Sequence, residues 1–164
     1  MDLLVLRHGK AEARGGGGPD GDRTLTKKGI RDIRRVARWM AWSGIIPDLI
    51  VSSPLARAKE TAEIMAERFP RAEDIAFWDE LAPGSEPGTV AARFGELQGT
   101  TLLLVVGHEP QLSSLIALLI GAGEDAHIVL EKGGIARIGN LASQSGRWGE
   151  LLWLLTVQQV RDMT

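Results

Sequence analysis

Short apolar runs alternate along the chain with longer segments in which apolar residues recur every three or four positions. The first run, Leu3-Leu4-Val5-Leu6, contains no polar residue, which is typical of a strand that is buried on both faces. It predicts a strand over residues 2–7. Similar runs predict strands at 48–52 and 101–106, and a shorter one at 75–78.

The segment after the first strand predicts a loop and then a helix. The glycine run Gly15–Gly18, followed by Pro19, predicts an irregular loop, which we interpret as a mobile rim over a site at the end of the first strand. Thr26 is a suitable N-cap for a helix that runs to about Ser43 and is stopped by Gly44. The apolar positions of this helix fall at helical spacing: Ile30, Ile33, Ala37, Met40 and Ala41.

Polar and aromatic residues cover the rest of this helix. Arginines stand at positions 31, 34, 35 and 38, and such a group is more often a solvated helix face than a binding patch. Trp39 and Trp42 are expected near the exposed side of the helix, where they would mark a dimer or partner surface.

Three more helices are predicted further along. Ser53 and Pro54 match the N-cap and the first position of a helix whose buried stripe includes Ala58, Ala62 and Met65. A helix is predicted near 87–97, although Gly88 and Gly95 in this range disfavour helical structure. Another helix is predicted from Pro110 to about Ile120.

The last third of the chain has extended apolar runs near 127–130, 134–139 and 150–157. We expect them to add strands to the edge of the sheet. The alternation of strands and helices before them predicts an α/β fold with a mostly parallel central sheet and helices on both faces. The 164 residues fit one domain.

Composition narrows the class of protein. The formal net charge is −2, so the chain lacks the excess of basic residues that is typical of proteins that bind nucleic acid, and we do not expect a nucleic-acid partner. The absence of cysteine excludes disulfides and thiolate catalysis. No apolar stretch is long enough to span a membrane, and no signal peptide is visible before the first strand. A cytoplasmic protein is therefore expected.

Charged side chains follow each of the three main strands. Arg7 and His8 end the first strand, Arg57 lies in the first turn of the helix after the second, and His108 follows the central strand. Ligands of open α/β sheets bind at the carboxyl ends of strands. Arginine forks and free helix N–H groups bind phosphate oxygens, so these residues predict a pocket for a doubly charged anion. Gly9 is expected to let the backbone turn sharply and to remove bulk near the ligand.

Other residues are candidates for smaller roles. Lys132 precedes two glycines and is either a phosphate ligand or a solvated turn lysine. Glu80 is a candidate acid, or alternatively a solvated loop charge, as are the loop residues Asp20 and Asp22. His8 and Glu12 lack further ligands for a metal ion, so neither a metal nor a cofactor is expected.

Three motifs, in this order, carry a resemblance to a known family: Arg7-His8-Gly9, Ser53-Pro54-Leu55-Ala56-Arg57-Ala58 and Gly107-His108-Glu109-Pro110. With them the chain resembles the histidine phosphatase (phosphoglycerate mutase-like) superfamily, and within it the SixA-like phosphohistidine phosphatases. The resemblance covers residues 7 to about 137. It implies a three-layer α/β/α sandwich.

The resemblance also implies a mechanism. His8 would be a nucleophile that is transiently phosphorylated, while Arg7, Arg57 and His108 hold the phosphate oxygens without a metal. Neighbouring positive charge would keep His8 neutral, as a nucleophile must be.

One position departs from the family. Pro83 stands where many members place a glutamate that protonates an alkoxide leaving group. This favours phosphohistidine on a protein as substrate, because imidazole leaves more easily than an alkoxide. A broad small-molecule phosphomonoesterase and a non-catalytic domain that binds phosphate or phosphoproteins remain alternatives. The sequence leaves the oligomeric state open.

Overall fold

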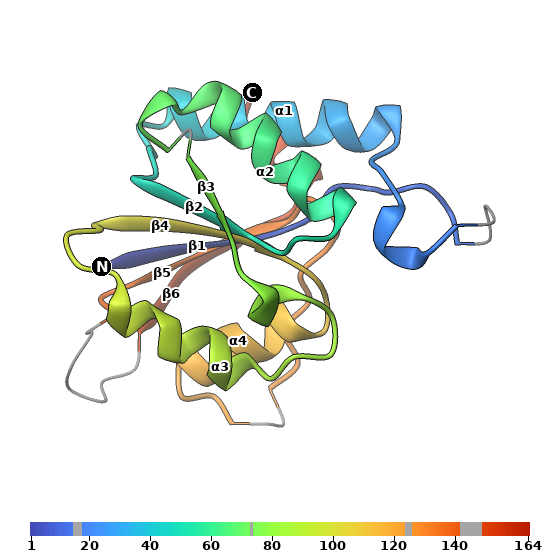
Figure 1. Cartoon of the computed structure of the whole chain (residues 1–164). Helices are drawn as coiled ribbons and strands as arrows, with labels where there is room; N and C mark the ends of the chain where they lie inside the picture. Colours follow the sequence, from blue (N-terminus) through green and yellow to red (C-terminus); the bar gives the residue numbers. More distant parts are fainter. Residues whose placement is uncertain (15–17, 73, 124–125, 142–148) are drawn as a thin grey trace.

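The computed structural model describes residues 1–14, 18–72, 74–123, 126–141 and 149–164. Gly15–Gly17 of the predicted rim loop lie outside these residues. The described chain forms a 6-stranded sheet in the order β3-β2-β4-β1-β5-β6 (Figure 1). Its strands are β1 (Asp2–Arg7), β2 (Leu49–Ser52), β3 (Ile75–Phe77), β4 (Leu102–Gly107), β5 (Ile135–Gly139) and β6 (Glu150–Leu155). The predicted α/β fold class is confirmed.

Parallel pairing holds the first four strands of the sheet together. β4 lies between β1 and β2 and is parallel to both, with Leu104 opposite Leu4 on one side and Ile50 on the other. β5 and β6 join antiparallel at the β1 edge. The carboxyl ends of β1, β2 and β4 therefore meet at one edge of the sheet.

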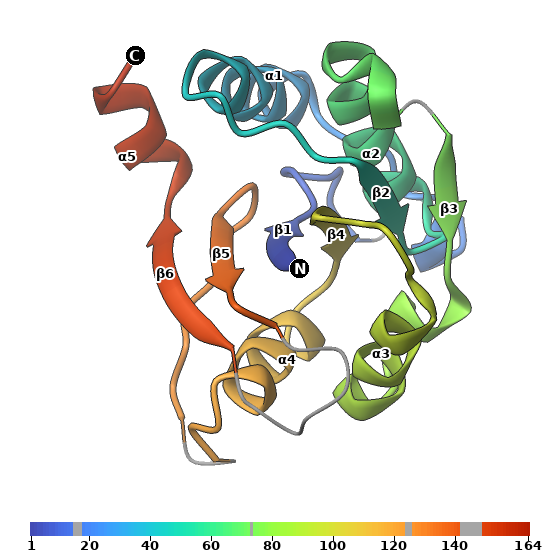
Figure 2. The ribbon, with the colours of Figure 1, turned by 90° about the vertical axis from the view of Figure 1, so that its left-hand side faces the viewer.

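Helices cover both faces of the sheet (Figure 2). One face carries α1 (Lys27–Trp42), α2 (Ala56–Arg68) and α5 (Val157–Asp162), and the other carries α3 (Pro87–Arg93) and α4 (Gln111–Leu119). Alternate residues of β1 enter the two cores: Leu4 and Leu6 pack under α1 and α2, while Leu3 and Val5 face α3 and α4. This double burial explains why the strand sequences are uninterruptedly apolar.

The N-terminus of α1 forms as predicted. The Thr26 side chain accepts a hydrogen bond from the Gly29 N–H at 3.0 Å, and Gly44 ends the helix with a left-handed φ of 71°. Trp39, however, is buried rather than exposed, and its ring packs edge-on against Trp153. Trp42 is exposed, as expected.

The predicted start of α2 is wrong by two residues. The helix begins at Ala56, and Ser53 instead lies in the preceding turn, where its hydroxyl accepts a bond from Leu55 N–H at 3.3 Å. Ser53 is fully buried, and the same hydroxyl also contacts His108 Nε2. α3 ends at Arg93 and continues as a 3-10 turn over Phe94–Glu96, which contains Gly95.

The last third differs from its prediction at two places. Residues 127–130 form no strand, and the Leu130 carbonyl instead accepts a hydrogen bond from the Arg7 side chain. After β6 the chain forms α5, which was not predicted; the predicted extended run 150–157 overlaps it only at Val157. The sequence feature that marks the start of α5 is a capping box. The Thr156 side chain accepts a hydrogen bond from the Gln159 N–H, and the Gln159 side chain accepts one from the Thr156 N–H.

None of the helices formed by the described residues combines the length and the apolar character that a membrane span requires.

Gly29 gives a test of the packing between α1 and the loop after β1. A Cβ at this position would lie 2.2 Å from the Lys10 carbonyl oxygen, whereas a Cβ at Gly88 in α3 would meet nothing within 4 Å. Alanine normally stabilises a helix relative to glycine. We expect Gly29→Ala to lower the free energy of unfolding by about 1–3 kcal/mol, because the backbone must shift. Gly88→Ala, the control, should leave it unchanged or raise it. Urea denaturation measures both, and a neutral Gly29→Ala would contradict this packing.

Candidate active site

A pocket of about 710 Å³ lies at the carboxyl ends of β1, β2 and β4. The structure brings Arg7, His8, Arg57, His108 and Lys132 together in its lining. Two of the residues that the sequence offered as candidate acids, Glu80 and Asp22, do not line it. The predicted convergence of the strand-end residues is thus observed.

His8 is held in one orientation by its neighbour. Its Nδ1 lies 2.7 Å from the Gly9 carbonyl oxygen, and the side chain is only 7% exposed. Because a carbonyl only accepts hydrogen bonds, the partner assigns the proton to Nδ1 and the lone pair to Nε2. The pKa of His8 is lowered to about 4, mainly by burial; the hydrogen bond to the Gly9 carbonyl opposes this shift, and the charges of Arg57 and Arg7 add to it. Burial, more than neighbouring charge, keeps the imidazole neutral.

His108 is the second buried imidazole. Its ring centroid lies 5.0 Å from that of His8, and its Nε2 lies 2.8 Å from the Ser53 hydroxyl. Burial is again the main cause that lowers its pKa, to about 3, followed by the nearby charges of His8 and Arg57. Both histidines are therefore neutral at physiological pH.

Arg57 and Arg7 bring positive charge beside these rings. Arg57 is 4% exposed, and Arg7 donates from Nη1 to the Leu130 carbonyl oxygen at 2.9 Å. Buried nitrogens without a hydrogen-bond partner among the described residues are Arg7 Nε, Arg57 Nε and His108 Nδ1. Buried donors are normally paired, so this group of polar nitrogens is suited to an oxyanion.

Backbone contacts from distant segments fix the end of β1. The Thr61 hydroxyl accepts from Gly9 N–H at 3.1 Å and donates to the Arg57 carbonyl at 2.7 Å. Gly133 N–H donates to the carbonyls of Arg7 and His8 at 3.1 and 3.2 Å. These contacts join α2 and the turn before β5 to the Arg7-His8 segment. Thr61 and Gly133 carried no chemical signal of their own in the sequence.

Gly9 has a different role from the one predicted. A Cβ there would lie 2.9 Å from Ile33 Cγ1 and 3.2 Å from the Gly29 carbonyl oxygen, both in α1. Its φ is outside the left-handed region. The missing side chain thus allows close packing against α1, and the backbone conformation does not itself require glycine.

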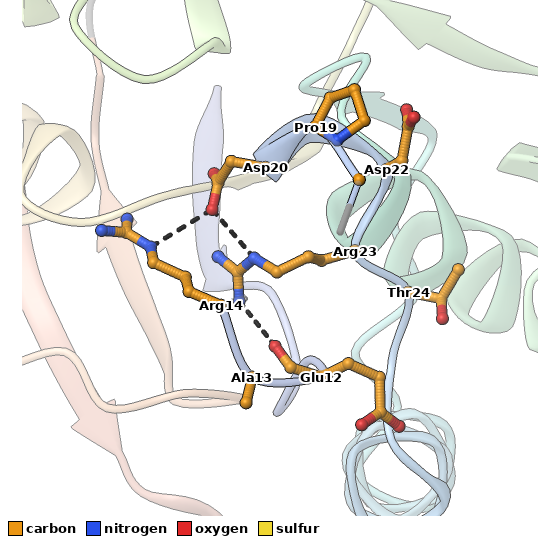
Figure 3. A pocket seen from close by; sticks show the side chains of 9 residues that line it. Glu12, Ala13, Arg14, Pro19, Asp20, Asp22, Arg23 and Thr24 are labelled. Carbon is orange, nitrogen blue, oxygen red and sulfur yellow. Dashed lines mark hydrogen bonds and ion pairs between the residues drawn. The ribbon is translucent and has the colours of Figure 1, made fainter. Parts of the chain in front are cut away.

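Asp20 brings a carboxylate to the pocket. Its carbonyl and its carboxylate both contact Arg57, at 2.9 Å from Nη1 and 3.3 Å from Nη2. Its other carboxylate oxygen pairs with Arg14 at 3.2 Å and Arg23 at 2.9 Å (Figure 3). The hydrogen bond from Arg23 and the charge of Arg57 lower the pKa of Asp20. It is therefore an anion at neutral pH and not a proton donor.

Glu80 is not brought to the pocket. Its carboxylate accepts a hydrogen bond from Arg93 at 2.8 Å, and the Arg93 guanidinium lies over the Trp78 ring. Pro83 does line the pocket, and so does Glu109, which the sequence reading did not single out. The Glu109 carboxylate accepts from Ser113 N–H at 3.0 Å at the start of α4.

No group of three or more histidine, aspartate or glutamate side chains within the described ranges is arranged to hold a metal ion.

The chain is similar to proteins of a known family. Residues 3–85 match the histidine phosphatase superfamily (branch 1). An uncharacterized protein of Picosynechococcus sp. is 34% identical over 139 residues, 82% of each chain. The phosphohistidine phosphatase SixA of Escherichia coli K12 is 28% identical over 121 residues, 73% of this chain and 74% of that protein.

Solved structures share the fold. The protein histidine phosphatase SixA complexed with tungstate has a TM-score of 0.84 at 24% identity, over 100% of both chains. The alpha-ribazole phosphatase of Shigella flexneri has a TM-score of 0.77 at 21% identity, over 96% of this chain and 97% of that one.

The two buried histidines make the free energy of unfolding depend on pH. An unfolded histidine takes up its proton near pH 6.5, whereas His8 and His108 stay neutral in the folded protein down to about pH 4 and 3. Between these values the unfolded state binds more protons, so stability is complete above pH 6.5 and decreases as the pH falls toward the folded pKa values. We expect a loss of up to about 1.4 kcal/mol per pH unit for each histidine between pH 6.5 and 5.

Urea denaturation at several pH values measures this slope. His108→Gln should reduce it by roughly half, since one of the two depressed groups is removed. An unchanged slope in the variant would show that the carboxylates, and not the histidines, cause the dependence.

The contact between Asp20 and Arg57 gives a second prediction for the pocket. The carboxylate occupies Arg57 and repels any anion that approaches it. Asp20→Asn should therefore bind inorganic phosphate or tungstate several-fold more tightly, as measured by calorimetry. Asp22→Asn removes the same charge from the same loop, and among the described residues no hydrogen bond or ion pair joins Asp22 to Arg57, so this variant should bind as the wild type does. If the wild type and Asp20→Asn bound the anion with equal affinity, the Asp20 carboxylate would not compete with the anion for Arg57.

Proposed function

Because the chain belongs to the histidine phosphatase superfamily, we propose that it is a phosphatase in which His8 accepts the phosphoryl group, and that its substrate is phosphohistidine carried by a protein. The observation that carries this proposal is the hydrogen bond between His8 Nδ1 and the Gly9 carbonyl at 2.7 Å. This hydrogen bond leaves Nε2 unprotonated, with a free lone pair, and His8 lines the same pocket as Arg7 and Arg57. A fixed, neutral imidazole beside fixed positive charge is what nucleophilic attack on a phosphoryl group requires.

The reaction proceeds in two displacements. In the first, the His8 Nε2 lone pair forms a bond to phosphorus while the bond from phosphorus to the substrate's imidazole nitrogen breaks. The departing imidazole takes the electron pair. In the second, water attacks phosphorus, the bond to Nε2 breaks, and its electron pair returns to His8. The proton of the attacking water passes to phosphate or to solvent.

The cationic and polar groups stabilise the transferring phosphoryl group. Arg7 and Arg57 hold its oxygens, and their buried Nε groups are without a partner among the described residues. When the Ser53 hydroxyl donates to His108 Nε2, the His108 proton lies on Nδ1, which then donates to a third oxygen. Lys132 adds positive charge at the rim of the pocket. Such positioning and charge stabilisation supply most of the catalysis in phosphoryl transfer.

Three positions at which a proton donor was expected cannot supply a proton to the leaving group, and this supports imidazole as the leaving group. Pro83 has no proton to give, Glu80 is paired with Arg93, and Asp20 is held as an anion by Arg23 and Arg57. An imidazole whose other ring nitrogen is protonated leaves as a neutral molecule and needs no such acid. The named activity of the SixA relative supports the same substrate class.

One observation favours a second candidate, a phosphomonoesterase that acts on small molecules. The Glu109 carboxylate lines the pocket beside His108 and is the nearest counterpart of a general acid there. Direct comparison of substrates therefore forms part of the test.

His8→Asn tests the nucleophile. It keeps a polar side chain of similar reach but has no basic nitrogen, so release of phosphate from phosphohistidine should fall at least a thousandfold, and ³²P labelling of the enzyme should disappear. The control, Glu80→Gln, should retain both, because Glu80 lies outside the pocket. Turnover that persists in His8→Asn would overturn the assignment. If β-glycerophosphate were hydrolysed as fast as phosphohistidine, the second candidate, the phosphomonoesterase, would be favoured. In that case Glu109→Gln should abolish the hydrolysis of β-glycerophosphate.

A further inference from the structure

One face of α1 is strongly basic. The helix has a single acidic residue, Asp32, and this residue is turned inward and is 7% exposed. At about 100° per residue, the basic side chains fall within roughly 120° of the helix circumference, opposite the buried face. We call this surface the basic stripe, and it consists of Lys27, Lys28, Arg31, Arg34, Arg35 and Arg38.

Part of the basic stripe is neutralised and part is not. Asp32 contacts Lys28, Arg35 at 3.9 Å and Arg161 at 3.7 Å. In the part of the chain that the structure describes, no ion pair engages the other basic residues, Lys27, Arg31, Arg34 and Arg38. They are spaced three or four residues apart, where like charges repel and destabilise a helix. The chain nevertheless has a net charge of −2, so its acidic residues lie elsewhere.

An exposed tryptophan stands at the far end of the basic stripe. Trp42 is 79% exposed, and it lines a groove of about 600 Å³ together with Arg35, Arg38 and Arg161. Arginine and tryptophan are the residues most enriched at the energetic centres of protein interfaces. Their combination here distinguishes this surface from an ordinary solvated helix face.

The near end of the basic stripe reaches the pocket. Thr26, the N-cap of α1, lines the pocket, and so does Lys10, whose carbonyl accepts a hydrogen bond from the Thr26 hydroxyl. α1 runs from this edge of the sheet back across its face (Figure 1). Its 16 residues span about 24 Å from the mouth of the pocket to Trp42.

We propose that the basic stripe and Trp42 dock an acidic segment of the protein whose phosphohistidine enters the pocket. This inference rests on the proposed function and adds a recognition surface to it. The charge of the surface is complementary to a carboxylate-rich segment, and its length matches about eight extended residues. A nucleic acid fits less well, because the basic surface is confined to one helix and the rest of the chain is net acidic. The arginines of this helix thus have a role that the sequence pattern did not indicate.

Two synthetic peptides of equal length test the proposal. Each carries one phosphohistidine, followed within about eight residues by four glutamates in one peptide and four glutamines in the other. At low salt the wild type should show kcat/KM about tenfold higher for the glutamate peptide, because charge complementarity speeds association. Arg31→Glu/Arg38→Glu should abolish this preference and leave turnover of free phosphohistidine unchanged. This variant keeps the helix, since the new glutamates face Lys27, Arg34 and Arg35 at helical spacing.

A matched control separates docking from net charge. Lys59→Glu/Arg68→Glu makes the same charge change on α2 and should keep the preference for the glutamate peptide. Equal kcat/KM for the two peptides in the wild type, or an equal loss of preference in both variants, would overturn the docking surface. Competition by oligo(uridine) stronger than by the unphosphorylated glutamate peptide would assign the surface to nucleic acid instead. Wild-type protein that does not hydrolyse free phosphohistidine would refute the proposed function itself, whatever the peptides show.

Discussion

The parallel pairing of β4 with β1 on one side and β2 on the other is the constraint on which the site depends. It places the residues after Arg7, Ser52 and Gly107 at the same edge of the sheet. Because the cores on both faces fix the register, a shift of one residue would turn Leu4 and Leu104 out of the core beneath α1 and α2. The apolar packing that stabilises the sheet therefore also fixes the relative positions of His8, Arg57 and His108.

Burial then sets the chemistry of these side chains. Removing two imidazoles from water, next to two guanidinium groups, keeps both rings neutral at physiological pH. This arrangement opposes folding at acid pH, where the unfolded chain gains protons that the folded chain excludes. Close packing makes the burial achievable, since Gly9 and Gly29 let the loop after β1 lie directly against α1. In our proposal, the loss of stability at acid pH accompanies a His8 imidazole that is neutral, and therefore able to act as a nucleophile, at neutral pH.

In our proposal, α1 takes part in both catalysis and recognition of the substrate. Its inner face supports the loop that carries His8, through the contact of Ile33 with Gly9. Its outer face carries the basic stripe, which begins at the mouth of the pocket and includes cations that pair with no described residue. In our proposal the pocket selects the phosphoryl group by its oxygens, and the helix selects the protein that carries it by its charge.

The sequence alone determined the features that are local in the chain. Uninterrupted apolar runs identified β1, β2 and β4, Thr26 identified the start of α1, and the position of each charged residue after a strand identified Arg7, His8, Arg57 and His108. The capping box of Thr156 and Gln159 was equally local, so α5 was within reach of the same reading. These signals suffice because backbone hydrogen bonding and hydrophobic periodicity act between near neighbours.

Only the tertiary structure decided which distant groups meet. It pairs Glu80 with Arg93, sets Asp20 against Arg57, uses the Leu130 carbonyl to hold Arg7, and buries Trp39 beside Trp153. Each of these outcomes depends on how separate elements pack, and a flexible charged side chain can choose among several partners of similar energy. The sequence therefore identified the chemical groups of the site, and the fold decided which of them are free to act.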